Sequence, residues 1–242
     1  MNAISIRGLT KKYKDTVALN DLWLDIKKGE LFSLLGINGA GKSTTVKILS
    51  GILSPTDGDA LVLSESVRGD WSKTKSKIAV SPQETAIAPN LSVYENLEFM
   101  CGAHGFSKEK TKEKCSEISK KLGLDSVLKK RASTLSGGYQ RRLSIALALI
   151  SEPEILFLDE PTLGLDVIAR SELWELIRSL RGKTTIILTT HYMEEAEALS
   201  DRIGIMNAGS LIALGTVKEL LLETGKTKFE DAFVAIVKGE RV

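Results

Sequence analysis

Residues 30–44 read ELFSLLGINGAGKST, an apolar segment followed by a loop rich in glycine. Residues 30–35 have the length and composition of a buried strand, and residues 42–50 have the pattern of a helix. The loop between them fits G-x-x-x-x-G-K-[ST], in which backbone amides cradle phosphate oxygens. A plain glycine-rich turn is the alternative, but strand, loop and helix stand in the order that phosphate binding requires. The sequence therefore predicts an α/β fold built around a phosphate-binding loop.

This loop also predicts which side chains meet the ligand. Lys42 is expected to reach the β and γ phosphates of a nucleotide, and Ser43 is expected to bind Mg²⁺. Thr44 adds another hydroxyl group to the same cradle. The predicted nucleotide-contacting residues of the loop are Asn38, Gly39, Ala40, Gly41, Lys42, Ser43 and Thr44.

A pair of carboxylates follows a second buried segment. Residues 155–158 are large and apolar, as in a strand covered on both faces, and Asp159 and Glu160 come directly after them. We expect Asp159 to bind Mg²⁺ and Glu160 to orient or deprotonate the water that attacks the terminal phosphate. For Glu160 alone, an acidic cap on the following segment is the alternative. Asp166 precedes a predicted helix at 167–180, either as its N-cap or as a contact between two copies of the chain.

A histidine stands at the end of a third strand-like segment. Residues 184–190 are rich in β-branched side chains, and His191 follows them. A parallel sheet would bring His191 near Asp159, because it aligns the carboxyl ends of its strands at one edge. We therefore predict that His191 contacts the γ-phosphate or the attacking water, the alternative being a hydrogen-bonded structural residue. For the other histidine, His104, no chemistry is expected.

A second glycine-rich helix start lies at residues 135–140, which read LSGGYQ. Ser136 is a candidate cap, and Gly137 and Gly138 would expose the first amides of the helix. A single nucleotide hardly needs two such loops. If this one binds the γ-phosphate of a nucleotide held by another copy of the fold, the working unit is a dimer with ATP at the joint. The apolar stripe expected to anchor the helix is Leu143, Ala146, Leu147 and Ile150.

Taken together, these motifs resemble the nucleotide-binding subunit of ATP-binding cassette (ABC) transporters. The matching segments are 36–44 (Walker A), Gln83 (Q-loop), 135–139 (signature), 155–160 (Walker B), 164–166 (D-loop) and His191 (switch). The resemblance covers roughly residues 2 to 220, with the motifs in family order. Residues 161–170 and 190–196 look most like the exporter branch that handles drugs, sodium, lipids or polysaccharides.

The resemblance implies further roles. Tyr13 would stack on adenine, and Gln83 would meet both Mg²⁺ and a membrane subunit. Ser136, Gly137 and Gly138 would bind the ATP of the partner. The implied cofactors are ATP and Mg²⁺, with the metal held by Ser43, Gln83 and Asp159. Tyr139 stands where the common signature has Gln, and Ile37 where the family commonly has Pro; neither change removes a catalytic group.

Length and composition favour one large domain over two. A chain of 242 residues with 43% hydrophobic residues can bury a full core. We predict a P-loop NTPase core with a mixed, mainly parallel sheet, and an N-terminal antiparallel β part in which apolar residues alternate. Within this single domain, 1–242, an inserted helical lobe is expected at 83–150 and a helical tail at 216–242. Capping boxes are predicted at Ser92/Glu95 and at Thr216/Glu219.

Charge and hydropathy restrict the partners. The chain has 33 basic and 31 acidic residues, so its net charge of +2 does not favour nucleic-acid binding. No apolar run reaches the roughly 20 residues of a spanning helix, and no secretory signal is visible. We expect a cytoplasmic chain, peripheral on the inner face of the cell membrane, with Cys101 and Cys115 as free thiols.

Two segments leave their environment open. The lysine-rich stretch 108–121 reads as a solvated helix face, with contact to anionic lipid as the alternative. The tail stripe of Phe229, Phe233, Ile236 and Val237 fits a helix that covers the core or one that binds a partner.

The sequence thus predicts an ATP-hydrolysing subunit that dimerises on ATP and drives transport, in the export direction, through separate transmembrane permease subunits. The second nucleotide-binding subunit would be an identical copy or a paralogue. A soluble, non-transport ABC ATPase, such as an iron–sulfur assembly factor, is the alternative. The chain has no coiled-coil arms, second cassette or cysteine-rich inserts, which disfavours most proteins of that class.

Overall fold

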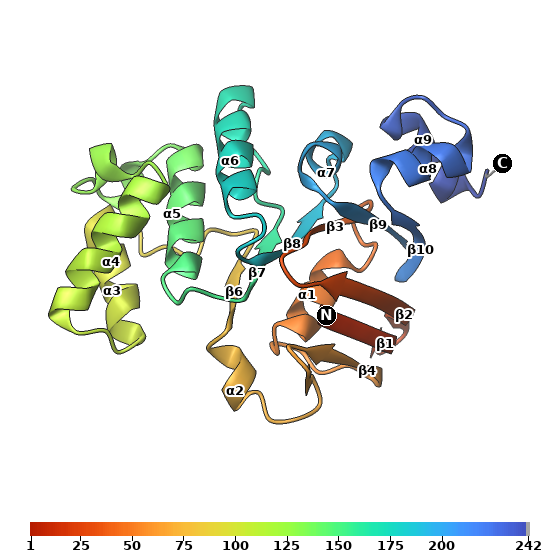
Figure 1. Ribbon diagram of the computed structural model, residues 1–242, viewed down its shortest axis with the longest axis horizontal. Coiled ribbons are helices and arrows are strands. Elements are labelled where there is room, and N and C mark those ends of the chain that lie inside the picture. The colour runs from red at the N-terminus through yellow and green to blue at the C-terminus, as the bar shows by residue number, and fades with distance from the viewer. Residues whose placement is uncertain (241–242) are drawn as a thin grey trace.

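The computed structural model describes residues 1–240 (Figure 1). Its strands are β1 (Asn2–Tyr13), β2 (Thr16–Lys27), β3 (Leu31–Leu35), β4 (Asp57–Val62), β5 (Glu65–Ser66), β6 (Ile78–Ser81), β7 (Ile155–Asp159), β8 (Thr185–Thr190), β9 (Arg202–Asn207) and β10 (Ser210–Gly215). Its helices are α1 (Lys42–Leu49), α2 (Ser72–Lys75), α3 (Val93–Ala103), α4 (Lys108–Lys121), α5 (Gly137–Leu149), α6 (Val167–Ser179), α7 (Met193–Leu199), α8 (Val217–Thr224) and α9 (Phe229–Lys238). The last two residues of the predicted domain and tail, 241–242, lie outside the described residues.

Two sheets organise the chain. The larger has the strand order β10-β9-β3-β8-β7-β6, and the smaller has the order β2-β1-β4-β5. In the larger sheet β6, β7, β8, β3 and β9 run parallel, whereas β10 pairs antiparallel with β9. The smaller sheet is antiparallel throughout. The predicted fold class, a mainly parallel sheet joined to an N-terminal antiparallel β part, is confirmed.

The register of the parallel strands places three loops at one edge. Leu35 of β3 pairs with Thr190 of β8, and Thr189 pairs with Asp159 of β7. Because parallel strands end at the same edge, the chain leaves all three strands at neighbouring points. The loop after β3, the acids at the end of β7 and the histidine after β8 therefore meet there.

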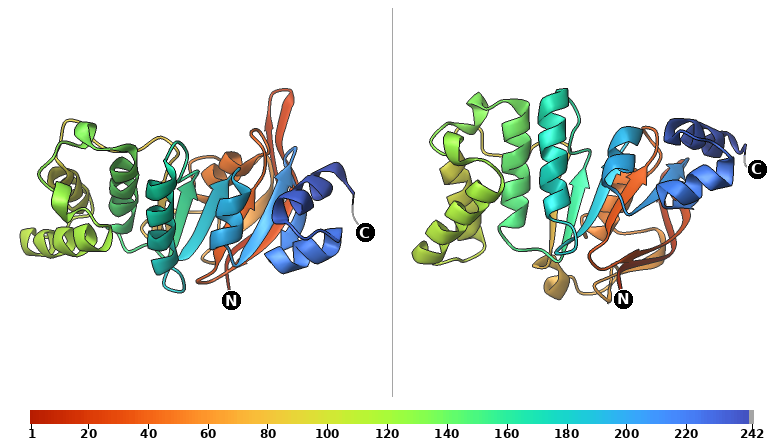
Figure 2. Two further views of the ribbon diagram at one scale, coloured as in Figure 1. Left: turned by 90° about the horizontal axis from the view of Figure 1, so that it is seen from above. Right: turned by 45° about the horizontal axis from the view of Figure 1, so that its top comes forward.

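The central strands separate two hydrophobic cores, because successive side chains of a strand point to opposite faces. In β7, Leu156 and Leu158 join a core built with α3, α4, α5 and α6, whereas Ile155 and Phe157 join a core built with the small sheet and α1. Figure 2 shows α6 and α7 lying over one face of the large sheet. This burial on both faces explains why residues 155–158 are continuously apolar.

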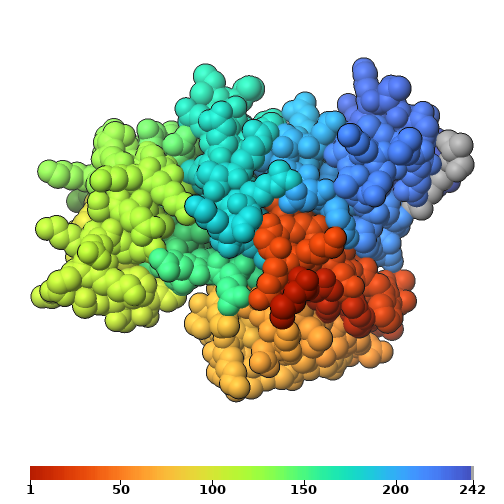
Figure 3. Space-filling view, viewed as in Figure 1, coloured from red at the N-terminus to blue at the C-terminus, as the bar shows by residue number. Residues whose placement is uncertain are grey.

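Helices α3, α4 and α5 fall within the predicted lobe 83–150 and gather at one end of the molecule (Figures 1 and 3). The capping box of α3 is present, since the Ser92 side chain accepts from the Glu95 amide and the Glu95 carboxylate accepts from the Ser92 amide. The apolar stripe of α5 is also confirmed, because Leu143, Ala146, Leu147 and Ile150 are all buried.

The lysine-rich helix α4 has the predicted solvated face, with Lys108, Lys110, Lys112, Lys120 and Lys121 exposed, but Lys114 is an exception. Lys114 is only 5% exposed, and its ammonium group contacts Glu117 at 3.0 Å and Glu152 at 2.5 Å. Glu152 follows α5 in the chain, so this lysine ties α4 to the end of α5. Burial lowers the pKa of Lys114, but the hydrogen bonds to Glu152 and Glu117 outweigh it and raise the pKa overall. Sequence spacing alone could not separate Lys114 from its exposed neighbours.

The C-terminal tail covers the core. Helix α8 begins with the predicted capping box of Thr216 and Glu219. In α9, Phe229, Phe233 and Ile236 are buried in a third cluster with residues of β9 and β10. This packing settles the choice left open for the tail stripe, although Val234 on the same helix stays 42% exposed. Among residues 1–240 no helix has the length and apolarity needed to cross a membrane.

Candidate nucleotide-binding site

The glycine-rich loop joins β3 to α1 in a conformation that needs glycine. Gly41 is the N-cap of α1, with a φ of 103°, and a Cβ there would lie 2.7 Å from the carbonyl oxygen of Ala18. Both the left-handed backbone and the close approach exclude a larger residue. The amides of the first helical turn, residues 42–44, have no partner within the helix. They are therefore available to an anion at the end of β3.

Lys42 lies at the centre of this loop and is 5% exposed. Its ammonium group donates to the carbonyl oxygens of Gly36 at 2.7 Å and Ile37 at 3.2 Å. It also lies 3.5 Å from Oε1 of Glu160. The cation is thus held by the loop backbone and paired with the second of the two predicted acids.

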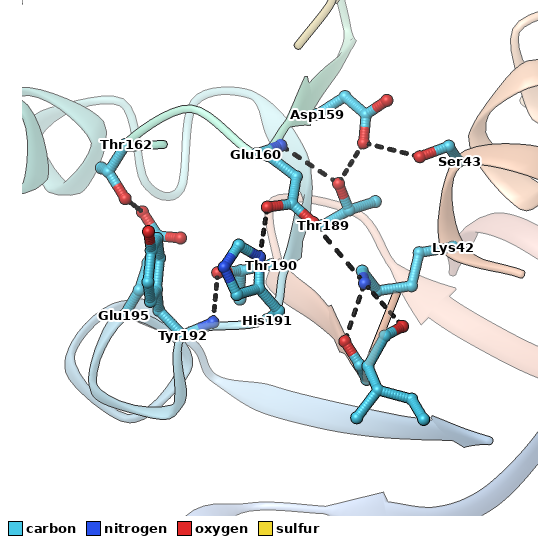
Figure 4. A network of polar contacts seen from close by, with 12 residues as sticks. Lys42, Ser43, Asp159, Glu160, Thr162, Thr189, Thr190, His191, Tyr192 and Glu195 are labelled. Atoms are coloured by element: carbon cyan, nitrogen blue, oxygen red, sulfur yellow. Dashed lines mark hydrogen bonds and ion pairs between the residues drawn. The ribbon is translucent and has the colours of Figure 1, made fainter. Parts of the chain in front are cut away.

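The first acid, Asp159, gathers hydroxyl groups. Oδ1 accepts a hydrogen bond from Ser43 Oγ at 3.2 Å and another from the Thr189 hydroxyl (Figure 4). Residues 1–240 contain no cluster of three or more His, Cys, Asp or Glu side chains that could hold a metal alone. Mg²⁺ commonly takes one or two carboxylates and completes its shell with water and phosphate oxygens. The Asp159 carboxylate and the Ser43 hydroxyl fit such an ion, and the free helix amides beside them fit the phosphates that would complete its shell.

Glu160 is placed by an unusual backbone. Its φ of 49° lies in the left-handed region, which costs a residue other than glycine about 1–3 kcal/mol. Its amide donates to the Thr189 carbonyl at 3.1 Å, and its Oε2 lies 2.5 Å from Nδ1 of His191 (Figure 4). Glu160 is 7% exposed, so its carboxylate is enclosed between Lys42 and His191. The cap of α6 is Asp166, whose side chain accepts from the Ala169 amide, so Glu160 is not the acidic cap of that helix.

A cavity of about 560 Å³ brings together the predicted loop residues, Gln83, Glu160 and His191, whereas Asp159 is not part of its lining. Its lining is Thr16, Val17, Ala18, Asn38, Gly39, Ala40, Gly41, Lys42, Ser43, Thr44, Gln83, Glu160, Leu163 and His191. Gln83 comes from the segment after β6, so the cavity draws on four strand ends. Tyr13 is not part of this lining. It lies at the end of β1, 44% exposed, with the Lys11 ammonium 5.2 Å from its ring, while Val17 takes the place in the wall.

The second glycine-rich start lies outside this cavity. Ser136 is the N-cap of α5, but its side chain accepts no hydrogen bond from the first turn of the helix, so the predicted capping bond is wrong. Ser136 and Gly137 are exposed, and a Cβ at Gly138 would lie 3.0 Å from Cβ of Ala169 on α6. The hydroxyl and the first amides of α5 therefore face outward.

Three polar residues close to the cavity escaped the sequence analysis. Thr189 bonds to Asp159 and to the Glu160 amide, and Arg141 of α5 is buried beside the Gln83 segment. Glu195 of α7 is fully buried, and its Oε1 accepts from Thr162 at 2.8 Å and from Trp174 at 3.2 Å. Burial raises the pKa of Glu195, and the nearby charge of Glu160 adds to the effect. The position of Thr189, two residues before His191, is the one signal that could have identified it.

Comparison with known proteins identifies the family of the chain. The family described as ABC transporter matches residues 19–163. A probable multidrug ABC transporter ATP-binding protein, YbhF of Escherichia coli, is 40% identical over 240 residues, which are 97% of this chain and 41% of that protein. The linearmycin resistance ATP-binding protein LnrL of Bacillus subtilis is 38% identical over 92% of this chain and 72% of its own length.

A solved structure resembles the whole architecture. The ATP-binding cassette MJ0796, in a dimeric post-hydrolysis state with ADP and Pi, superposes with a TM-score of 0.80 and 27% identity, over 88% of this chain and 98% of that one. The chain spans less than half of the E. coli relative and about three quarters of the Bacillus relative. With the phosphate loop, the paired acids and the histidine at one sheet edge, the chain belongs to the ABC transporter family and has the P-loop NTPase fold of its ATP-binding cassettes.

Proposed function

We propose that the chain binds ATP in the cavity at the edge of the large sheet and hydrolyses it. One observation carries this proposal: the Glu160 carboxylate contacts both Lys42 and His191, beside a loop with free helix amides. The lysine is suited to bind phosphate, and the carboxylate is suited to activate water. The imidazole is suited to contact the terminal phosphate.

The side chains divide the work. Lys42 and the amides of residues 42–44 offset the charge of the phosphates. Glu160 accepts a proton from, or orients, the attacking water, and His191 contacts the γ-phosphate. Ser43, Asp159 and Gln83 would hold Mg²⁺, which neutralises developing charge on the phosphates when it is bound. Tyr13 or Val17 would contact the adenine base.

The contacts among these groups define a resting arrangement. Lys42 and His191 both bind the Glu160 carboxylate, and both are the groups proposed to meet phosphate. A terminal phosphate entering between them would compete for the same donors. Release of Glu160 from Lys42 and His191 would free its oxygens for water. Binding of ATP therefore prepares the catalytic base in this proposal.

The second glycine-rich start would complete the site of another copy. Ser136 and Gly137 are exposed, Gly138 is partly buried, and all three lie outside the cavity of their own chain, as a surface that binds a partner's ATP requires. The related cassette MJ0796 is described as dimeric, which supports this arrangement. Closure on two ATP molecules and opening after hydrolysis would supply the motion.

That motion would drive export of a substrate through separate transmembrane permease subunits, with the chain on the cytoplasmic face of the membrane. The names of YbhF and LnrL, a probable multidrug transporter protein and a drug-resistance protein, favour the export direction and a drug-like cargo. The second nucleotide-binding subunit is a copy of this chain or a paralogue, and no nucleic acid takes part.

The test measures ATP hydrolysis against protein concentration. A site completed by a second chain predicts a rate per chain that rises with concentration, together with recovery of hydrophobic membrane proteins when the tagged chain is purified from membranes. Hydrolysis at full rate by a strictly monomeric chain would remove the shared site. Capture of soluble iron–sulfur assembly proteins instead of membrane proteins would favour the alternative class.

A further inference from the structure

Arg141 is a buried charge that the proposed chemistry leaves unused. It lies on the first turns of α5, only 4% exposed, although an arginine in this position of the sequence looks like an ordinary polar residue of a helix. Buried arginines are rare unless they are paired or hydrogen-bonded, so its partners decide what it does.

Those partners are two consecutive carbonyl groups. Nη1 of Arg141 donates to the Pro82 carbonyl at 2.6 Å, and Nη2 donates to the Gln83 carbonyl at 2.6 Å. The planar guanidinium offers its donors at a fixed spacing, so both peptide groups are held in one orientation. Gln83 itself is exposed, with its side chain in the wall of the nucleotide cavity. Arg141 thus holds the backbone of Gln83, and the same residue lines the cavity proposed to bind the nucleotide.

The contact joins distant parts of the chain. Gln83 follows β6, which pairs with β7 so that Ser81 lies opposite Leu158, next to Asp159. Arg141 belongs to the helix that starts at Gly137 and carries the second glycine-rich loop. Burial lowers the pKa of the Arg141 guanidinium overall, and the negative charges of Asp159 and Glu195 offset part of that effect. Arg141 therefore links helix α5 to the segment after β6 and lies near the acids at the edge of the sheet.

We propose that Arg141 is a positioning residue for Gln83: it fixes the glutamine backbone to the first turns of α5, so that the place of Gln83 in the cavity follows the place of the helix. This inference rests on the proposed role of Gln83 as a ligand of Mg²⁺. A movement of α5 is then passed to the metal site through one guanidinium group. The affinity of the site for Mg²⁺ then depends on the position of α5, the helix whose N-terminus is proposed to bind the ATP of another copy.

A merely structural arginine would stabilise the junction without affecting the metal site, and a matched control separates the two cases. Ser144 lies on the same face of α5, one turn later, and its hydroxyl contacts the Ser81 hydroxyl at 3.0 Å. Ser144→Ala removes a buried hydrogen bond at the same helix–strand junction without touching Gln83. Arg141→Lys keeps the charge but replaces the fork by a single point of donation.

The experiment uses the full chain with Glu160→Gln, so that ATP is bound and not consumed. The dissociation constant of ATP is measured in excess Mg²⁺ and in EDTA, and their ratio gives the tightening caused by the metal. Adding Arg141→Lys should reduce this tightening about tenfold, the effect typical of residues that orient a metal ligand, with little change in EDTA. Adding Ser144→Ala should leave the ratio unchanged even where it lowers the melting temperature as much.

Amide hydrogen exchange of residues 81–88 in the free chain gives a second readout that needs no metal. Exchange there should rise with Arg141→Lys and stay near the original rate with Ser144→Ala. Equal behaviour of the two variants in both measurements overturns the proposal, and so does an ATP affinity that Mg²⁺ does not change. Absence of hydrolysis by the unmodified chain would instead overturn the proposed function, because neither measurement here depends on turnover.

Discussion

The two glycine-rich helix starts have the same chemistry and opposite surroundings. The loop before α1 is enclosed: Lys42 is buried within it, and Asp159, Glu160 and His191 converge on it from neighbouring strand ends. The start of α5 is exposed, and its N-cap Ser136 leaves the first turn without a side-chain partner. The first loop has its proposed catalytic side chains beside it in the same chain. The second offers only hydrogen-bond donors at an exposed helix start.

This difference predicts in which assays a substitution in each loop should impair ATP binding or hydrolysis. Damage to the enclosed loop should impair binding or chemistry in every assay, because all its partners lie in the same chain. Damage to the exposed loop should matter only when another surface is present. Substitutions in the two regions therefore test whether the two loops differ in this way.

The largest effect is expected from Glu160→Gln. Removal of a catalytic base lowers turnover about 10²- to 10⁴-fold, while ATP binding should persist because the amide keeps the shape of the side chain. The measurement is kcat together with the dissociation constant of ATP. Glu154→Gln, at the opposite end of β7 and paired with Lys28 and Lys77, is the control and should retain turnover. Turnover near the original value in Glu160→Gln would remove the base from this loop.

Lys42→Met should weaken ATP binding next. A charge-assisted contact to phosphate is worth about 1.5–3 kcal/mol, which corresponds to roughly a 10- to 100-fold rise in the dissociation constant. Calorimetry of ATP binding measures it. Lys47→Met, on the exposed face of the same helix, controls for the loss of one positive charge from α1. Equal losses in the two variants would mean that net charge, and not the loop, binds the nucleotide.

Ser136→Ala tests the exposed loop. It should leave ATP affinity of the dilute chain unchanged and lower kcat about tenfold at concentrations that favour association, because a hydroxyl contact to a charged phosphate is lost. The readout is kcat as a function of concentration. Ser133→Ala, an exposed serine just before the loop, serves as the matched control. A loss of affinity in the dilute chain would place Ser136 in its own nucleotide site and abolish the contrast between the regions.

The smallest effect concerns the helix that follows His191. Because burial raises the pKa of Glu195 above its usual 4.5, the folded chain binds a proton more tightly there than the unfolded chain. Stability is fully present below the usual pKa and falls as pH rises toward the raised one. Glu195→Gln keeps the acceptor for Thr162 and Trp174 without the charge, so its stability should fall less as pH rises from about 5 toward neutrality.

Denaturant unfolding across this pH range measures the effect. The neighbouring Glu194→Gln, whose side chain is 82% exposed, is the control and should follow the unmodified chain. Parallel pH profiles for Glu195→Gln and the unmodified chain would show that Glu195 is not the group that titrates.

The sequence predicts the residues of the enclosed loop better than the residues from distant segments that hold the site in place. Residues 36–44, 155–160 and 191 are recognisable because each stands at the end of a strand-like segment, and a parallel sheet brings such ends together. Asp166, Ser92 and Thr216 cap helices as predicted, since capping depends on residues three positions apart. Local rules of this kind transfer directly to the fold.

What the sequence misses depends on contacts between distant segments. Arg141 is 58 positions from Gln83, and Lys114 is 38 positions from Glu152, so neither contact leaves a periodic signal. Glu195 has the composition of an exposed helix residue and becomes buried because α7 packs against Trp174 of α6. Tyr13 is exposed at the end of β1 and does not line the cavity, so its contact with adenine stays a prediction.

The left-handed backbone at Glu160 implies a trade-off between thermal stability and activity. Asparagine and glycine adopt this conformation with less strain than glutamate, yet neither supplies a carboxylate. A laboratory screen that rewards only survival at high temperature would therefore tend to replace this acid and return sturdier, inactive proteins.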